Sequence, residues 1–243
     1  MGSEKDITTR ISERQMRRWN ALHPKGSAKI SPPRFITISR SEGTLGDEIA
    51  QTLSECLGWR LYDREIVNAI ANDSHVREEL VRRLDEKSQD LFDETLLDRI
   101  FHLLRLPDSY HFSSEDYSES LLKTLATLAI QGNAILVGRG ANFALHNSKY
   151  GFHIRTIGSL EVRVERLSKS RQMPPEIARR NIQAIDADRR AFIYRLYKHD
   201  IDDPSYYTLI VNTDHLTVQQ VVASVTSMLN PAKTESQPLL AAN

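Results

Sequence analysis

The nine residues from Arg40 to Glu48, RSEGTLGDE, combine residue types that could bind phosphate. They follow an apolar run that begins at Phe35 and precede a helix-like pattern. A strand, a glycine-containing loop and a helix in this order direct backbone N–H groups at an oxyanion. A standard phosphate loop ends with a lysine and a hydroxyl residue, which reach the outer phosphates and magnesium. Because this sequence has Gly46 and Asp47 at those positions, the stretch fits either a phosphate loop that works with other groups or a structural turn.

Two acidic residues at the end of the loop change the electrostatics of the predicted phosphate site. Asp47 and Glu48 fall in the first helical turn, where each interacts favourably with the helix dipole by about 0.3–1 kcal/mol. Two like unit charges about 4 Å apart repel each other by roughly 4 kcal/mol at an effective dielectric constant of about 20. A bound Mg²⁺ would reverse this effect, because carboxylates are ordinary ligands of the ion. We therefore take Asp47 and Glu48 as candidate magnesium ligands and Arg40 as a source of positive charge.

Elements that could position this loop alternate along the chain. Short apolar runs bounded by turn residues predict buried strands, and apolar residues at helical spacing predict helices that pack on them. The expected strands cover residues 35–39, 59–63, 133–140, 152–158 and 208–214. The expected helices cover residues 46–57, 74–106, 121–130, 159–199 and 216–229, with a mobile loop at 107–119. This alternation indicates an α/β fold with a mostly parallel sheet covered by helices on both faces.

The composition is typical of one globular domain with short extensions. The chain has 243 residues, of which 40% are hydrophobic and 26% charged, enough for one well-formed core. Basic and acidic residues balance at 32 each, so we expect no membrane binding and no specific nucleic-acid partner. Cys56 is the single cysteine and the first residues are charged rather than apolar, which favours a cytoplasmic protein without an internal disulfide. We expect a basic extension and linker at 1–34, a domain at 35–230 and a disordered tail at 231–243.

Four segments occur in a characteristic order: ITISRSEGTLGDEIAQTLSECLGWRLYDREIV, ILVGRGANFAL, DADRRAFIYRLY and DPSYYTLIVNTDHLTVQQVV. Together they resemble the cytidylate kinase-like family of P-loop proteins over about Phe35 to Leu229. The resemblance implies a P-loop nucleoside-monophosphate-kinase-like core with a helical acceptor-binding insertion at about 73–131 and a lid at about 168–200. It also implies a nucleotide ligand, and Mg²⁺-dependent transfer of the terminal phosphoryl group of ATP to an acceptor such as CMP or dCMP.

The resemblance assigns acceptor-binding roles near the ends of two strands. Asp63 matches the aspartate after the second strand, near which these kinases bind the acceptor, but Arg64 replaces the family's serine. Arg139 matches an arginine at a strand end that reaches the acceptor phosphate. The aspartate that follows this arginine in the family is replaced by Gly140.

The resemblance also assigns a pair of residues to the lid. Asp186 and Arg189 match a D-x-x-R pair in which the aspartate recognises the acceptor and the arginine contacts phosphate. Arg139, Asp186 and Arg189 are therefore the catalytic candidates, and they bind the acceptor together with Asp63 and Arg64. The donor nucleotide is expected to contact Arg40, Ser41, Glu42, Gly43, Thr44, Leu45, Gly46, Asp47 and Glu48.

Two charged regions allow more than one interpretation. The acidic helical region at 73–106 fits an enlarged acceptor-binding subdomain, the surface of a homo-oligomer or a covering layer. In the lid, a group of arginines either faces phosphate from one side of a helix or is solvated and paired with Asp186 and Asp188. These arginines are Arg179, Arg180, Arg189, Arg190 and Arg195.

The loop departs from the family's pattern at the residues that carry charge. Cytidylate kinase-like sequences often have G-S-G-G-R-E, which lacks the usual lysine but keeps a base, whereas this chain has G-T-L-G-D-E from Gly43 to Glu48. Phosphoryl transfer depends on positioning and charge stabilisation, so three alternatives stay open: an active kinase, an inactive relative that serves as a nucleotide sensor or interaction module, and a protein that binds no nucleotide. From the sequence pattern, replacing Gly46 with lysine and Asp47 with serine is expected to strengthen ATP binding.

Overall fold

A computed structural model describes residues 33–64, 67–68 and 114–229, all of which belong to the unit that begins at Pro32. The expected basic extension, acidic helices and C-terminal tail lie almost wholly outside these residues. The proposed domain boundaries therefore stay predictions. No helix within the described ranges is long and apolar enough to cross a membrane.

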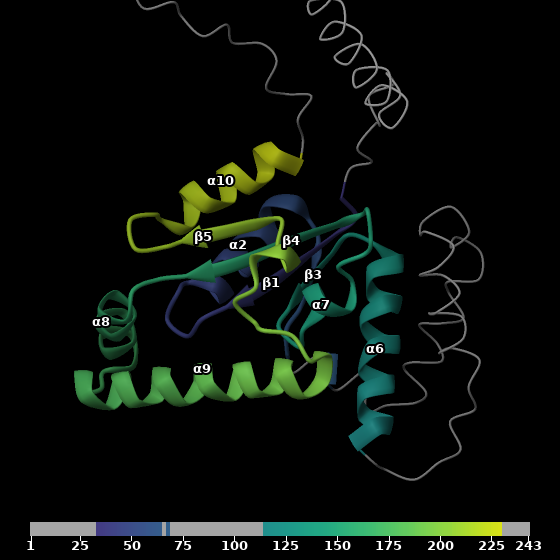
Figure 1. The fold of residues 1–243 in the computed structure, drawn as a ribbon. Helices are drawn as coiled ribbons and strands as arrows, with labels where there is room; N and C mark the ends of the chain where they lie inside the picture. The colour runs from purple at the N-terminus through teal and green to yellow at the C-terminus, as the bar shows by residue number, and fades with distance from the viewer. Residues whose placement is uncertain (1–32, 65–66, 69–113, 230–243) are drawn as a thin grey trace, which may run out of the picture. The chain divides into compact units, whose positions relative to one another are not determined.

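The described part of the chain forms a parallel five-stranded sheet in the order β2-β3-β1-β4-β5 (Figure 1). Every pairing is parallel, as the alternation of strands and helices predicts. The strands are β1 (Phe35–Arg40), β2 (Arg60–Tyr62), β3 (Ala134–Val137), β4 (Gly151–Ile157) and β5 (Leu209–Asn212). The central position of β1 places the end of the loop-bearing strand between the ends of β3 and β4.

Helices cover both faces of this sheet. Successive residues of β1 point to opposite sides, and the apolar side chains on both sides are buried by helices. Phe35 packs in one core cluster with Leu121, Leu125 and Leu128 of α6. Ile36 and Ile38 pack in another, with residues of α2 and α10. The helices are α2 (Gly46–Leu57), α6 (Ser114–Gln131), α7 (Ala141–Ala144), α8 (Leu160–Arg171), α9 (Pro175–Tyr197) and α10 (Val218–Leu229). The α/β architecture predicted from the sequence is confirmed.

Two local predictions need correction. The loop expected at 107–119 is wrong for its last six residues, since α6 begins at Ser114. The single helical stretch expected at 159–199 is two helices, because Gln172 takes a left-handed conformation after α8 and Pro175 opens α9. Proline suits the first position of a helix, whose N–H has no intrahelical partner.

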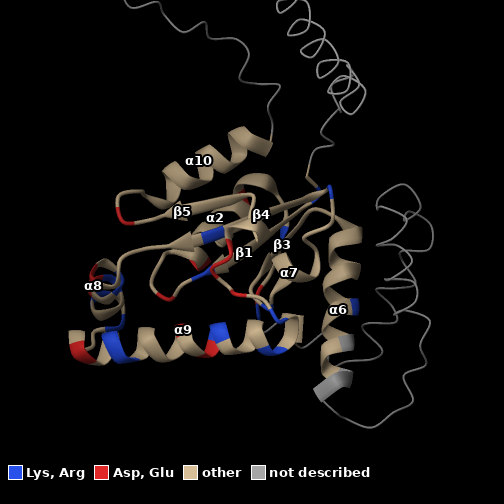
Figure 2. Cartoon of the chain, in the orientation of Figure 1, with Lys and Arg blue, Asp and Glu red and all other residues tan. Residues whose placement is uncertain are grey.

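Helices α8 and α9 form a layer that passes the carboxyl end of β1. Val164 and Leu167 of α8 pack against Ala178 and Ile182 of α9. The C-terminal part of α9 packs instead on α7, through Ile193 and Phe143. Figure 2 shows that acidic and basic residues alternate along α9, with further basic residues on α8. This helix therefore connects the loop after β1 with the turn after β3.

Candidate active site

The loop after β1 is anchored to the neighbouring strand β4. Ser41 N–H donates to the Thr156 carbonyl at 3.1 Å, and the hydroxyl groups of Thr44 and Thr156 lie 2.7 Å apart in the interior. Gly43 and Leu45 have φ angles of 78° and 58°, a region that costs a non-glycine residue about 1–2 kcal/mol. The anchoring to β4 holds this turn and leads directly into α2.

All nine loop residues predicted to contact the donor, Arg40 to Glu48, line one cavity of about 610 Å³, which we call the loop cavity. Its opposite wall is the C-terminal half of α8, including Arg166, Lys169 and Arg171. The Thr44 hydroxyl is directed to β4 rather than available as a ligand. The structure thus brings the nine predicted loop residues together around one cavity, with the Thr44 hydroxyl engaged by Ser41 and Thr156.

Gly46 has no room for a side chain. A Cβ at this position would lie 2.6 Å from Cβ of Arg40 and 2.8 Å from Oγ1 of Thr156. Contacts below 3 Å force one partner to move, and here one partner is the base of a packed side chain. Lysine at Gly46 would therefore distort the loop, so the substitution proposed from the sequence pattern is not a sound test of ATP binding.

Arg40 is the cation at the base of the loop. Its Nε donates to Oδ1 of Asp47 at 2.9 Å, with the Arg40 side chain 14% exposed and that of Asp47 66% exposed. Nη1 of Arg40 lies against Gly138, where an added Cβ would approach it to 2.6 Å. Burial lowers the pKa of the Arg40 guanidinium, and the Asp47 carboxylate opposes that shift. An arginine keeps its proton under such conditions, so Arg40 supplies a fixed positive charge.

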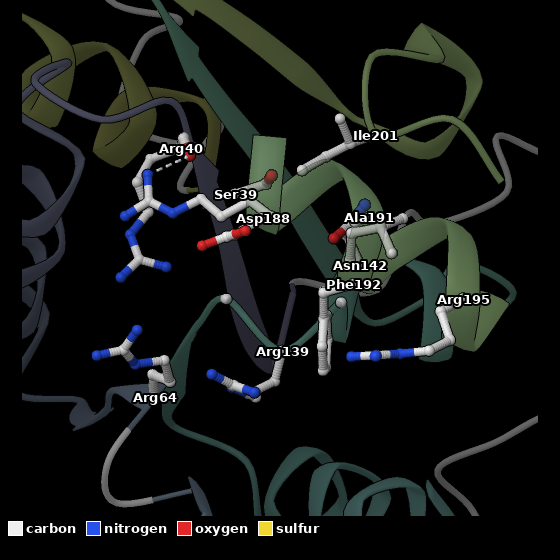
Figure 3. Close-up of a pocket in the computed structure, with 14 residues that line it drawn as sticks. Ser39, Arg40, Arg64, Arg139, Asn142, Asp188, Ala191, Phe192, Arg195 and Ile201 are labelled. Atoms are coloured by element: carbon white, nitrogen blue, oxygen red, sulfur yellow. Dashed lines mark hydrogen bonds between the residues drawn. The ribbon is translucent and has the colours of Figure 1, made fainter. Parts of the chain in front are cut away.

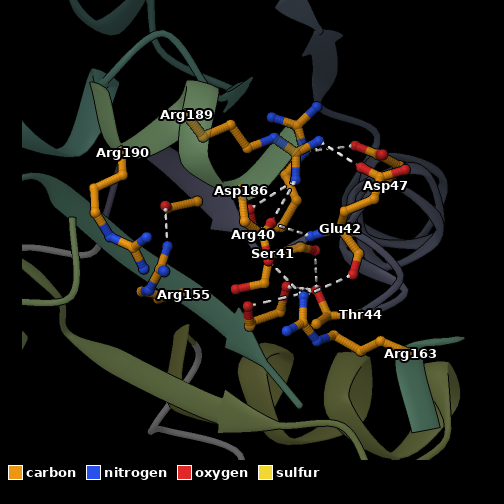
Figure 4. A network of polar contacts seen from close by, with 12 residues as sticks. Arg40, Ser41, Glu42, Thr44, Asp47, Arg155, Arg163, Asp186, Arg189 and Arg190 are labelled. Atoms are coloured by element: carbon orange, nitrogen blue, oxygen red, sulfur yellow. Dashed lines mark hydrogen bonds and ion pairs between the residues drawn. The ribbon is translucent and has the colours of Figure 1, made fainter. Parts of the chain in front are cut away.

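A second acid of the loop, Glu42, is almost enclosed by charged groups of α8 and α9 (Figure 4). Its carboxylate contacts Arg189 Nη2 at 2.7 Å and Arg171 Nη2 at 3.0 Å. Its N–H donates to Oδ1 of Asp186 at 2.8 Å, and its carbonyl accepts from Arg163 Nη1 at 3.2 Å. Arg163 also pairs with Asp186 at 2.5 Å. Each polar group of Glu42 is therefore engaged by α8 or α9.

The second cavity, of about 380 Å³, lies at the carboxyl ends of β1 and β3 (Figure 3). Gly138 N–H donates to the Ile38 carbonyl at 3.0 Å, which aligns the two strand ends. Ligands of open parallel sheets bind at this edge. We call this the arginine cavity, because its charged lining consists of Arg40, Arg64, Arg139, Arg189, Arg195 and Asp188.

Arg139 enters the arginine cavity from an unusual backbone position. Its φ is 54°, and the glycines on both sides also have positive φ. The guanidinium stacks over the ring of Phe192 at 4.7 Å from the centroid, and Nη1 lies 3.4 Å from the Tyr117 hydroxyl. Nε is buried and has no hydrogen-bond partner among the described residues. Strained backbone of this kind costs about 1–3 kcal/mol and is concentrated at functional sites.

The space beside Arg139 is filled by Tyr197 of α9. The Tyr197 hydroxyl donates to the Arg139 carbonyl at 2.9 Å, and a Cβ on Gly140 would overlap the tyrosine ring, with Cζ at 2.8 Å. Burial raises the pKa of this phenol above its usual range, so it stays protonated as a donor. An aspartate like that in the family's pattern would not fit at position 140.

The other predicted residues differ in whether they line a cavity. Arg64 and Arg189 line the arginine cavity, whereas Asp63 is not among its lining residues. Asp186 lines neither cavity and instead binds the loop amide of Glu42. Of the five arginines that the sequence assigns to a lid, Arg189 and Arg195 line the arginine cavity, while Arg179 and Arg190 pair with Glu161 and Asp202.

Several residues of the site were not predicted. Arg163 and Arg171 of α8 bind the loop residue Glu42, and Asp188 and Phe192 of α9 line the arginine cavity. No local pattern distinguishes these residues from other charged or apolar residues of a helix. The proximity of α8 to the loop is the feature that selects them.

The sequence pattern implies a magnesium ion, and the loop offers limited ligands for one. Among the residues that the structure describes, no three His, Cys, Asp or Glu side chains cluster around one point. Mg²⁺ often takes only one or two protein carboxylates and completes its shell with phosphate oxygens and water. Asp47 and Glu48 line the loop cavity, and one oxygen of Asp47 is used by Arg40. The pair thus fits an ion that is bound mainly by a nucleotide.

The fold and the two cavities define a parallel α/β protein with its candidate site at the carboxyl ends of β1 and β3. Residues 35–215 match the cytidylate kinase-like family, and the chain belongs to this family. The resemblance recognised from four sequence segments is thereby confirmed.

Individual relatives show how far the likeness extends. The cytidylate kinase of Methanocaldococcus jannaschii is 29% identical over 126 residues, which are 51% of this chain and 71% of that protein. The crystal structure of an uncharacterized protein from Eubacterium ventriosum matches 81% of this chain and 98% of its own length, with 16% identity and a TM-score of 0.59. The second likeness concerns the fold alone.

Proposed function

We propose that this chain is a nucleotide kinase that binds ATP at the loop cavity and a nucleoside monophosphate such as CMP or dCMP in the arginine cavity. The observation that carries the proposal is that Arg40 lines both cavities. In-line transfer requires donor and acceptor phosphates to approach each other from opposite sides of a charge-stabilised centre. Arg40 places a buried positive charge at that junction.

Arg40 takes over part of the task of the missing lysine. A phosphate-loop lysine provides a cation beside the outer phosphates, and Gly46 has no room for one. The guanidinium of Arg40 reaches the same region from the end of β1, while Gly138 leaves space for it. Since most of the catalysis in phosphoryl transfer is charge stabilisation, a cation in this place supplies the element that the sequence pattern lacks.

The acceptor phosphate is assigned to the arginines of the second cavity. Arg139 and Arg189 come from the β3 end and from α9, and Arg64 follows β2. Guanidinium groups bind phosphate oxygens through charge-assisted, often bidentate hydrogen bonds. The side chain of Phe192 holds the Arg139 guanidinium by a cation–π contact. The Mg²⁺ that accompanies ATP would be held by Asp47 and Glu48 and would neutralise charge on the phosphate chain.

The proposal is tested by ATP turnover with a panel of monophosphates and by one pair of variants. We expect ADP formation with a cytidylate-type acceptor, and at least a 100-fold lower kcat/KM for that acceptor in Arg139→Gln, since a phosphate contact in the transition state is lost. Arg179→Gln is the matched control, because Arg179 is an arginine of α9 that lines neither cavity. Equal losses in the two variants, or no turnover with any acceptor, would refute the assignment.

The inactive relative stays as a second candidate because of three specific contacts. Asp186 holds an amide of the loop, and Glu42 holds two arginines of the lid, so carboxylates occupy donors that phosphate would use. This candidate predicts that ATP with Mg²⁺ raises the melting temperature, as any ligand selective for the folded state does, without ADP formation. An unchanged melting temperature at millimolar ATP would argue against both candidates.

A further inference from the structure

The loop and the lid helices α8 and α9 are held together by two carboxylates, one from each side. The loop residue Glu42 places its carboxylate between Arg171 of α8 and Arg189 of α9, at 3.0 and 2.7 Å. In return, Asp186 of α9 accepts the N–H of Glu42 at 2.8 Å. Loop amides and lid guanidinium groups are the donors by which phosphate is bound in such sites. Both carboxylates thus satisfy donors of the kind that a nucleotide phosphate requires.

These contacts join the lid to the loop through charges of the chain itself. The Glu42 side chain is 11% exposed, and the Arg189 guanidinium also donates to the Arg40 carbonyl at 3.0 Å. Nη1 of Arg163 donates both to the Glu42 carbonyl and to the carboxylate of Asp186. A hydrogen bond to a charged group contributes about 1.5–3 kcal/mol, so the contacts together make a substantial barrier to separation of α8 and α9 from the loop.

We propose that Glu42 and Asp186 are internal competitors of nucleotide phosphate: they hold the lid against the loop, and a phosphate chain binds only by displacing them. The proposal rests on the proposed function for the identity of the phosphate site and concerns its regulation. It differs from the effect of Asp47 and Glu48, which lie at the start of α2 and do not contact the lid arginines in the described structure. The acid that opposes phosphate is therefore Glu42, and it acts by occupying Arg171 and Arg189.

The proposal predicts an affinity gain from removing a charge. Glu42→Gln keeps the size of the side chain but removes the competing anion, so binding of inorganic tripolyphosphate should become about tenfold tighter, equivalent to about 1.4 kcal/mol. Asp186→Asn should also tighten binding, because it weakens the hold on the loop amide. Glu42→Asp retains the charge and should show no such gain. Isothermal titration calorimetry at fixed ionic strength, with thermal unfolding of each variant, measures these effects.

A matched control separates the specific effect from a general change in charge. Glu161→Gln removes a carboxylate from α8 that pairs with Arg179 in the described structure, and neither residue lines a cavity, so it should leave tripolyphosphate affinity unchanged. Unchanged or weaker binding in both Glu42→Gln and Asp186→Asn would overturn the proposal. Failure of both variants to fold would also overturn it, because the carboxylates would then be structural supports.

The same measurements distinguish this inference from the proposed function. An active kinase whose Glu42→Gln variant gains no affinity contradicts the inference alone. A protein that turns over no monophosphate, but whose Glu42→Gln variant binds tripolyphosphate more tightly, contradicts the kinase assignment alone and supports the competition.

Discussion

The ring of Tyr197 lies against the α-carbon of Gly140 so closely that no side chain fits between them, while its hydroxyl donates to the carbonyl of Arg139. This contact fixes the turn that presents Arg139 to the arginine cavity, and it connects that turn to α9. It also accounts for glycine at a position where the family's pattern has aspartate.

We predict that Gly140→Ala destabilises the protein by about 2–4 kcal/mol, as the sum of a left-handed backbone and an overpacked contact. Gly140 has a φ of 68°, so part of this cost is independent of Tyr197. In a Tyr197→Leu background the steric part should disappear, which a double-mutant cycle in urea unfolding measures as a coupling free energy. Strictly additive free energies would show that the ring does not restrict Gly140.

The second prediction concerns Arg40 as the cation between the two cavities. If the kinase assignment holds, Arg40→Gln should lower kcat by at least 100-fold, because a charge near the transferred group is lost. Arg40→Lys should recover part of the rate, since it keeps the charge but not the geometry. Steady-state kinetics at saturating ATP and acceptor measure the effect.

Arg60 of the edge strand β2 provides a control for Arg40. Arg60 is an exposed arginine of β2 that lines neither cavity, so Arg60→Gln should keep the wild-type rate. An Arg40→Gln variant with unchanged kcat would remove Arg40 from the catalytic centre.

The sequence was sufficient for elements whose signals are local. The apolar run of β1, the glycine after α2 at Gly58 and the alternation of strands with helices predict the parallel sheet correctly. The strand order was not predictable in this way, because alternation specifies parallel pairing but not which strand lies at the centre. The placement of Arg40 beside Gly138 follows from that order, since β1 and β3 are neighbours.

The charge pattern of the loop shows a limit of sequence reasoning. It identified Asp47 and Glu48 as the acids that oppose phosphate, because both belong to the first turn of a helix. The structure leaves Asp47 exposed and buries Glu42 instead, since Arg171 and Arg189, more than a hundred residues later, converge on it. A buried charge depends on partners distant in sequence, so no local pattern indicates it.

The third prediction is a pH dependence of stability that comes from His153. Burial, with a smaller effect of His146, lowers the pKa of His153 to about 4, and its Nδ1 contacts the Thr37 hydroxyl at 2.8 Å. The unfolded chain has an ordinary pKa of about 6.5 at this residue. Below about pH 6.5 the unfolded state therefore binds a proton that the folded state excludes, and stability falls until the folded pKa is reached.

Between pH 7 and pH 4.5 this proton accounts for a loss of about 2.5 kcal/mol in the free energy of unfolding. Urea unfolding at several pH values measures the loss in the wild-type chain and in His153→Gln, which cannot titrate and should be flatter over this range. His146→Gln is the control from the surface and should keep most of the slope. Equal slopes for wild type and His153→Gln would mean that His153 can be protonated in the folded state, and that the interior around Thr37 is open to water.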